Sequence, residues 1–157
     1  MTDPQVPADT SLIGAAPASP QAAPVLLYDG VCGLCSKGVQ TILRFDRHGT
    51  LRFAAHDSAF ARAIIERHPS LQSTDALVFV ENPGHSEERI YSRSSANLRV
   101  AKYLGGPWQV LLVAGLIPVR LRDWLYDRLA SVRYRVFGKY DTCPLPHREV
   151  RARFLNN

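Results

Sequence analysis

The sequence predicts an α/β domain in which a four-stranded mixed sheet is flanked by helices and followed by a helical C-terminal extension. Three observations support this prediction. Short apolar segments of strand character alternate with segments whose apolar residues recur at helical spacing. Along the chain these segments run strand, helix, strand, helix, strand, strand and helix. The right-handed crossover rule then leaves few arrangements once the first two strands are parallel.

Size and composition suit a single domain of this kind. The chain has 157 residues, of which 46% are hydrophobic and 21% are charged, as in ordinary globular proteins. Residues 1–23 are rich in proline and alanine and hold few large apolar side chains, so we expect a disordered tail. This tail lacks the basic start and the apolar core of a signal peptide. The domain is therefore expected to span residues 24–157.

The first strand and the first helix meet at a pair of cysteines. Val25–Tyr28 is a short apolar run, and Asp29-Gly30-Val31 has the composition of a turn. The apolar period then changes to that of a helix, carried by Cys35, Val39, Ile42 and Leu43. Cys32 and Cys35 are thus placed where a strand passes into a helix.

This position favours thiol chemistry. The unpaired backbone N–H groups and the dipole of a helix N-terminus stabilise negative charge. They can lower the pKa of a cysteine from about 8.5 into the range of roughly 3.5–7.5. Cys32, at the cap, is expected to face solvent, and Cys35 is expected to point toward the core. One thiolate then attacks a disulfide and the second thiol resolves the mixed disulfide. Half of a metal site and a pair of packing cysteines are the alternatives.

The remaining elements complete the predicted order. The expected strands are Thr50–Ala54, Ala76–Val80 and Glu88–Ser92. One helix is expected from Asp57 or Ser58 to about His68, and another from Ser94 or Ser95 to Leu104. This order is that of a thioredoxin-like fold. The dithiol then lies at the carboxyl end of the first strand, where open α/β sheets place their chemistry.

The C-terminal extension is expected to begin at about residue 107. Pro107–Ile117 is the most apolar stretch of the chain, but it is shorter than the roughly 20 residues that span a bilayer. We therefore expect a helix packed on the core. Val119–Val136 is amphipathic, with arginines on one side and Leu121, Trp124, Leu125, Leu129 and Val132 on the other. Trp108 and Trp124 are both expected in the core.

Charge and cysteine content restrict the partners and the compartment. The net charge is +5, and arginines recur every few residues from Arg120 to Arg153. Such a surface suits an acidic partner or an anionic lipid, although a simple solvated face has the same composition. No RNA-binding motif or zinc finger accompanies it, so nucleic acid is not expected. Three cysteines are too few for a disulfide framework and indicate a reducing compartment, the cytoplasm.

The cysteine pair belongs to a longer pattern. Asp29, Cys32 and Cys35 form D-x-x-C-x-x-C within YDGVCGLC. Further segments follow in order: Gly105-Gly106-Pro107-Trp108, Arg122-Asp123, Tyr126-Asp127, Arg133-Tyr134-Arg135, Phe137-Gly138, Cys143-Pro144-Leu145-Pro146 and Arg153-Phe154-Leu155. On these residues the chain resembles the DCC family of predicted thiol-disulfide oxidoreductases. The resemblance implies a thioredoxin-like fold and a dithiol redox site. Thioredoxins commonly have a cis-proline before the third strand, but Ser73–Ala76 contains no proline, so substrate docking must differ.

The resulting hypothesis is a cytoplasmic dithiol-disulfide oxidoreductase. Cys32 attacks, Cys35 resolves, and Asp29 tunes the proton transfer. Asp29 is equally well explained as a turn residue whose side chain caps its own backbone. Substrates would be disulfides or thiols of proteins or small molecules, and the reaction needs no organic cofactor.

Two further features keep alternatives open. Cys143 is interpreted as an inert buried thiol, a third redox partner or a metal ligand. As a ligand it would complete a Cys₃His zinc site formed by Cys32, Cys35, Cys143 and His147. The domain would then be a metal-holding or non-catalytic binding module. Arg133 and Arg135 either raise the potential near the thiols or are ordinary cations near a helix C-terminus.

Overall fold

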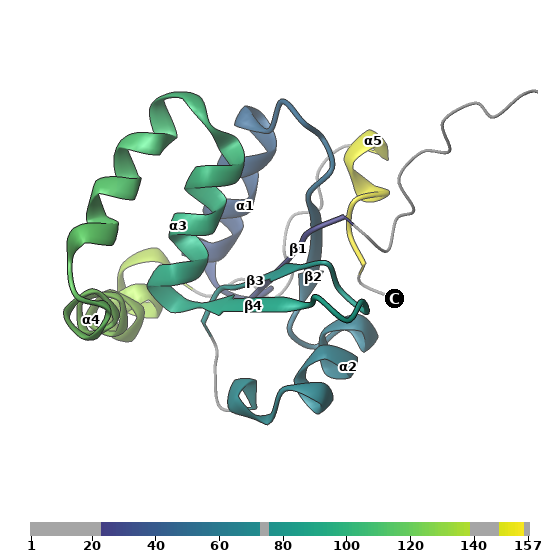
Figure 1. The fold of residues 1–157 in the computed structure, drawn as a ribbon, viewed down its shortest axis with the longest axis horizontal. Coiled ribbons are helices and arrows are strands. Elements are labelled where there is room, and N and C mark those ends of the chain that lie inside the picture. Colours follow the sequence, from purple (N-terminus) through teal and green to yellow (C-terminus); the bar gives the residue numbers. More distant parts are fainter. Residues whose placement is uncertain (1–22, 73–75, 139–147, 156–157) are drawn as a thin grey trace, which may run out of the picture.

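A four-stranded mixed sheet forms the centre of the molecule. The computed structural model describes residues 23–72, 76–138 and 148–155, so the predicted tail lies almost entirely outside the described residues. The strands are β1 (Val25–Tyr28), β2 (Arg52–Ala55), β3 (Val78–Glu81) and β4 (Arg89–Ser92). Their order across the sheet is β2-β1-β3-β4 (Figure 1), with β1 parallel to β2 and the other pairs antiparallel. The predicted fold class is confirmed.

Helices cover both faces of this sheet. Helices α1 (Gly33–Phe45) and α3 (Arg93–Leu104) lie on one face, and α2 (Ala59–Arg67) lies on the other (Figure 1). A short 3₁₀ turn, η1 (Pro69–Leu71), follows α2. The central strand β1 is buried on both sides: Leu26 and Tyr28 pack under α1 and α3, whereas Val25 and Leu27 pack under α2. This explains why the β1 sequence is continuously apolar instead of alternating.

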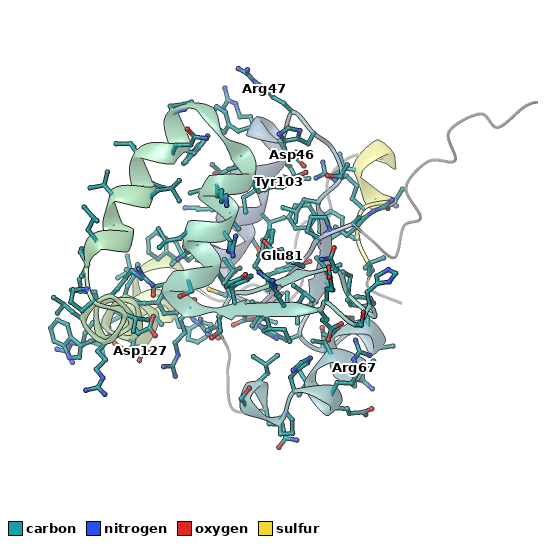
Figure 2. The ribbon with its side chains drawn as sticks, viewed as in Figure 1. Asp46, Arg47, Arg67, Glu81, Tyr103 and Asp127 are labelled. Carbon is teal, nitrogen blue, oxygen red and sulfur yellow. The ribbon has the colours of Figure 1, made fainter. Side chains whose placement is uncertain are left out.

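The C-terminal segment closes the outer edge of β2. Helix α5 (Arg148–Arg151) leads into a parallel bridge between Phe154 and Phe53. Arg153 forms an ion pair with the buried carboxylate of Asp46. Asp46 also accepts a hydrogen bond from the Tyr103 hydroxyl at 3.0 Å, and Figure 2 shows these two side chains together at the far end of α3. This cluster fixes the end of the sheet opposite to the cysteines.

The segment after α3 differs from its prediction. Gly106–Leu116 is the 3₁₀ segment η2, visible in Figure 1 as the green stretch between α3 and α4. Trp108 packs on the core beside Phe45, as expected. Other large apolar side chains of η2 do not pack on the core: Val110 is 70% exposed and Leu116 is 85% exposed. Because η2 packs mainly against α3, one side of it is covered and much of the remainder faces outward.

Helix α4 (Val119–Phe137) is also oriented differently from the prediction. The predicted apolar side, Leu121, Trp124, Leu125, Leu129 and Val132, is exposed, and Trp124 is 56% exposed instead of lying in the core. The polar side packs inward because hydrogen bonds hold it there. Arg122 donates to the hydroxyls of Ser94 and Ser95 at 2.8 and 3.2 Å, and Ser94 donates to Asp123. Among the described residues, no helix is both long enough and apolar enough to cross a membrane.

Candidate dithiol site

The first helix begins at the cysteines, as predicted. Cys32 is the N-cap of α1, with an extended backbone (φ −84°, ψ 119°). Its N–H donates to the carbonyl of Asp29 at 3.3 Å and closes the turn after β1. Cys35 lies in the first turn of the helix, and both cysteines are free thiols. The pair therefore occupies the carboxyl end of β1, where the helix N-terminus favours negative charge.

The burial of the two thiols corrects one expectation. Cys32 is fully buried and does not face solvent, whereas Cys35 is half-buried and packs against the α1–α3 side of the core. The end of α4 lies against the start of α1, next to Cys32. The N–H of Gly33 donates to the carbonyl of Gly138 at 3.3 Å, just beyond the last residue of α4. The cap position was predicted correctly, but the contact with the end of α4 was not.

Cys35 is strongly biased toward its protonated form. Burial, a hydrogen bond to the Cys32 sulfur and the charge on that sulfur raise the pKa of Cys35 to about 12. The Arg133 charge and a hydrogen bond from the Asp29 backbone act in the opposite direction and are weaker. The Cys35 thiol is thus a hydrogen-bond donor to the Cys32 sulfur. The geometry gives the two cysteines different roles, one as the acceptor of that bond and one as its donor.

Asp29 forms two different sets of contacts. One carboxylate oxygen accepts the N–H of Val31 at 3.0 Å, which is the turn-capping contact expected from the sequence. The other oxygen lies 3.3 Å from the Arg133 guanidinium and accepts the hydroxyl of Tyr134. The Asp29 side chain is 12% exposed. The turn cap therefore uses one oxygen of Asp29 and leaves the other for Arg133 and Tyr134, a contact that the sequence did not predict.

Arg133 is the most buried residue of α4, with 5% of its surface exposed. Its guanidinium donates to the Tyr134 hydroxyl at 2.9 Å and pairs with Asp29. Burial works against its positive charge, but the Tyr134 hydroxyl and both sulfurs outweigh burial, so the pKa of Arg133 is raised. Arg135 is exposed on the opposite side of the helix. Of the two arginines weighed from the sequence, only Arg133 therefore acts on the thiols.

Tyr126 is part of the pattern that resembles the DCC family, but the sequence predicted no role for it at the dithiol. Its hydroxyl accepts the N–H of Leu77, just before β3, at 3.1 Å. Burial raises the pKa of Tyr126, and the charges of Cys35 and Cys32 raise it further, whereas the Leu77 hydrogen bond and the Arg133 charge lower it. Tyr126 and Arg133 are seven residues apart, two turns of one helix face. That spacing is the sequence signal that places both side chains on the inner face of α4.

The zinc alternative depends on residues beyond the described part of the chain. Cys143 and His147 lie in 139–147, which the structure does not describe. Within the described ranges, no three metal-ligating side chains come together. The Cys₃His site therefore stays a prediction.

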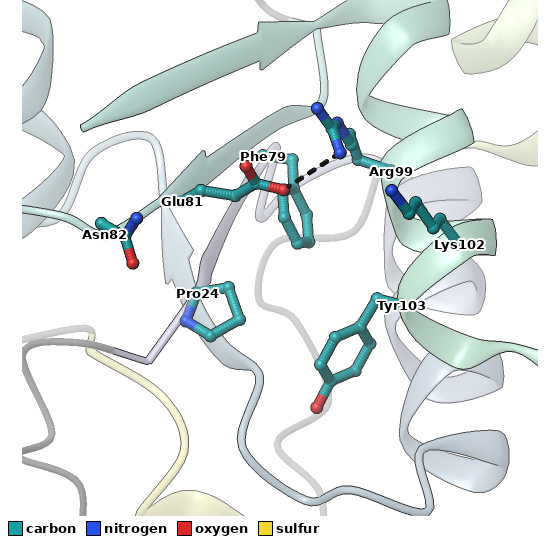
Figure 3. Close-up of a pocket in the computed structure, with 7 residues that line it drawn as sticks. All are labelled: Pro24, Phe79, Glu81, Asn82, Arg99, Lys102 and Tyr103. Atoms are coloured by element: carbon teal, nitrogen blue, oxygen red, sulfur yellow. Dashed lines mark ion pairs between the residues drawn. The ribbon is translucent and has the colours of Figure 1, made fainter. Parts of the chain in front are cut away.

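A shallow hollow of about 350 Å³ lies at the other end of the sheet. Figure 3 shows Glu81 and Arg99 paired across it, with Lys102 and Tyr103 on the α3 side. Pro24, next to the start of β1, also lines it, whereas the cysteines follow the end of β1. The hollow is therefore separate from the dithiol site.

Comparison with known proteins gives a family for this arrangement. The family model described as DCC1-like thiol-disulfide oxidoreductase matches residues 26–139. The chain belongs to this family. The uncharacterised protein YuxK of Bacillus subtilis is 33% identical over 132 residues, which cover 83% of this chain and 93% of the relative. A DCC family protein of Arabidopsis thaliana, named as chloroplastic, is 35% identical over 124 residues, covering 78% and 69%. No solved structure gives a significant match.

The span matched by the DCC1-like family contains the whole described site. It runs from β1 to just past the end of α4, so it includes Cys32, Cys35, Asp29, Tyr126 and Arg133. Cys143 and His147 fall beyond its last residue, 139. Membership in the family supports a role in thiol-disulfide redox chemistry for this chain.

Proposed function

We propose that this protein is a dithiol-disulfide oxidoreductase in which Cys32 is the nucleophile and Cys35 the resolving thiol. The observation that carries the proposal is the hydrogen bond from the Cys35 thiol to the Cys32 sulfur at the start of α1. A hydrogen-bond donor and a helix N-terminus both lie at the Cys32 sulfur, surroundings that are typical of reactive cysteines. The buried positive charge of Arg133 acts on the same pair of sulfurs.

The proposed reaction proceeds in two exchanges. The Cys32 thiolate attacks one sulfur of a substrate disulfide, forms a mixed disulfide and releases the other substrate sulfur as a thiolate. Cys35 then loses its proton and attacks the Cys32 sulfur, which releases the second substrate thiolate. The protein ends with a Cys32–Cys35 disulfide, and two electrons have passed to the substrate. An external dithiol reverses these steps and restores the reduced pair.

Asp29 and Arg133 control the second exchange in this scheme. Cys35 must lose a proton although its pKa is about 12. The Asp29 backbone hydrogen bond and the Arg133 charge are the two contacts that favour its thiolate. The Asp29 carboxylate holds the Arg133 guanidinium in this place at 3.3 Å. We therefore assign Asp29 to tuning proton transfer through Arg133.

The substrate class and the compartment follow from the same chemistry. A dithiol site takes disulfides or thiols of proteins or small molecules, and the exchange requires no organic cofactor. A chain with three cysteines and a reactive pair suits a reducing compartment, so we place the protein in the cytoplasm. The name of the Arabidopsis relative assigns that protein to the chloroplast.

The test measures alkylation of each thiol against pH by mass spectrometry, with and without a chelator. We expect Cys32 to be alkylated well before Cys35, with no effect of the chelator. In a disulfide-reduction assay, Cys32→Ser abolishes turnover, and Cys35→Ser accumulates the mixed disulfide on Cys32. Joint protection of Cys32, Cys35 and Cys143 that the chelator relieves would establish a metal site and end the redox proposal.

A further inference from the structure

Nearly all of the exposed large apolar side chains lie on one surface. We call it the η2–α4 face. Its members are Val110, Leu111, Val113, Leu116, Ile117, Val119, Leu121, Trp124, Leu125, Leu129, Val132 and Val136. Elsewhere in the described ranges only Val31 and Phe45 are large, apolar and exposed. Contiguous apolar surface of this kind marks an interaction site on a globular protein.

The two elements of this face lie along the same side of the molecule. In Figure 1, η2 descends along the left edge to α4, which is seen end-on at the lower left. One element therefore runs in the plane of the picture and the other runs perpendicular to it. The two elements therefore extend the η2–α4 face in two directions along this side of the molecule.

Basic side chains are interspersed with the apolar ones. Arg120, Arg128 and Arg135 are exposed on α4. At 100° per residue, Arg128 and Arg135 lie directly beside the stripe of Leu121 and Val132. Of the two acids of α4, Asp123 is half-buried and Asp127 is exposed, and Asp127 is paired with Arg93 at 3.6 Å. The segment from Gly106 to Val119 has no charged residue at all. The face is thus apolar with a net positive charge.

We propose that the η2–α4 face binds the surface of an anionic lipid bilayer. Interfacial helices insert leucine and tryptophan side chains into the headgroup boundary, while arginines extend to the phosphates. Trp124, in the middle of the face, supplies the aromatic anchor. Binding of this kind needs no membrane-spanning helix. The proposal is independent of the dithiol chemistry, because Arg133 and Tyr126 lie on the opposite side of α4.

Charge favours a lipid surface over a second copy of this chain. In a two-fold dimer the same patch faces itself, so Arg120, Arg128 and Arg135 of both copies would meet in one interface. Asp127 is already paired with Arg93 and leaves these charges unbalanced. An anionic bilayer neutralises them, because basic residues near such a surface bind favourably.

Flotation of the full-length protein with vesicles tests this proposal. We expect binding to vesicles of phosphatidylcholine with phosphatidylglycerol, weak binding to phosphatidylcholine alone, and loss of binding at high salt. Each arginine near an anionic surface changes binding about fivefold. Arg128→Gln with Arg135→Gln should therefore weaken binding about 25-fold. The control, Arg47→Gln with Arg89→Gln, has the same net charge, and Figure 2 shows Arg47 far from Asp127 on α4.

Tryptophan fluorescence tests the apolar part of the face. The spectrum should shift to the blue on anionic vesicles, and Trp124→Phe should remove the shift while circular dichroism confirms an unchanged fold. Leu116→Gln should weaken binding without altering stability, because Leu116 is 85% exposed. Equal binding by the two double variants would overturn the proposal. Sedimentation without lipid gives a second test. A dimer that Leu116→Gln dissociates would also overturn the proposal, because a second copy of the chain would then occupy the face.

Discussion

Helices α1 and α4 meet at the dithiol, yet they bury opposite kinds of side chain. Helix α1 follows the usual pattern, with Val39 and Ile42 in the core and its charged side chains, Lys37 and Arg44, exposed. Helix α4 buries Arg133 and exposes Leu125 and Leu129. An ion pair and several hydrogen bonds can therefore decide which side of a helix packs inward, even when this leaves its apolar side exposed. The inner face of α4 carries Arg133, which lies at the dithiol site, and its outer apolar face is exposed.

Breaking the inner face of α4 should have the largest effect. Arg133→Met removes the cation from a buried pair with Asp29, and an unpaired buried charge costs about 3–5 kcal/mol. Arg135→Met, two residues further on and exposed, should change stability by less than about 0.5 kcal/mol. Urea unfolding of both variants measures the contrast. Equal effects of the two substitutions would mean that the ion pair of Arg133 does not hold α4 in place.

Truncating the apolar residues of the two helices should give the next largest difference. Ile42→Ala in α1 empties a core position that is 7% exposed and should cost about 2–4 kcal/mol. Leu125→Ala in α4 removes a side chain that is 50% exposed and should cost less than about 0.5 kcal/mol. Thermal and urea unfolding without lipid compare them. A large loss in Leu125→Ala would show that the leucine face is covered within the protein.

This contrast also explains how far the sequence predicts the structure. The fold class, the order of the elements along the chain and the cysteines at the start of α1 follow from local signals: apolar runs, turn residues and a change of period. The rotation of α4 does not, because it depends on partners far away in the chain. Arg133 contacts Asp29, which precedes it by 104 residues. The contact between Gly33, next to the buried Cys32, and Gly138 also joins residues far apart in the chain.

A smaller effect is expected from the tyrosine that connects α4 to the sheet. Tyr126→Phe leaves the N–H of Leu77 without its acceptor at 3.1 Å, which should cost about 1–2 kcal/mol. It should also alter the alkylation of Cys35, because Tyr126 and the sulfurs interact. Tyr91→Phe is the matched control. Tyr91 lies on β4, and its hydroxyl donates to Glu81 and accepts from Arg99. Altered alkylation in both variants would remove Tyr126 from the site.

The smallest predicted effect is a pH dependence of stability in the reduced protein. The pKa of Cys35 rises from 9.0 to about 12 on folding, so above pH 9 the unfolded chain loses its proton while the folded protein keeps it. The stabilisation is therefore complete below the unfolded pKa and declines as pH increases toward the folded pKa. The loss should reach about 1 kcal/mol between pH 9 and 10.

Cys35→Ser provides the comparison that isolates this effect. The variant keeps the other groups with raised pKa values, Tyr103, Tyr126, Tyr134 and Arg133, but it lacks the Cys35 thiol. Urea unfolding of both proteins at pH 8, 9 and 10 should therefore give a steeper decline for the reduced wild type. Parallel declines would mean that Cys35 ionises as easily in the folded protein as in the unfolded chain. The hydrogen bond to Cys32 would then not distinguish the resolving thiol from the nucleophile.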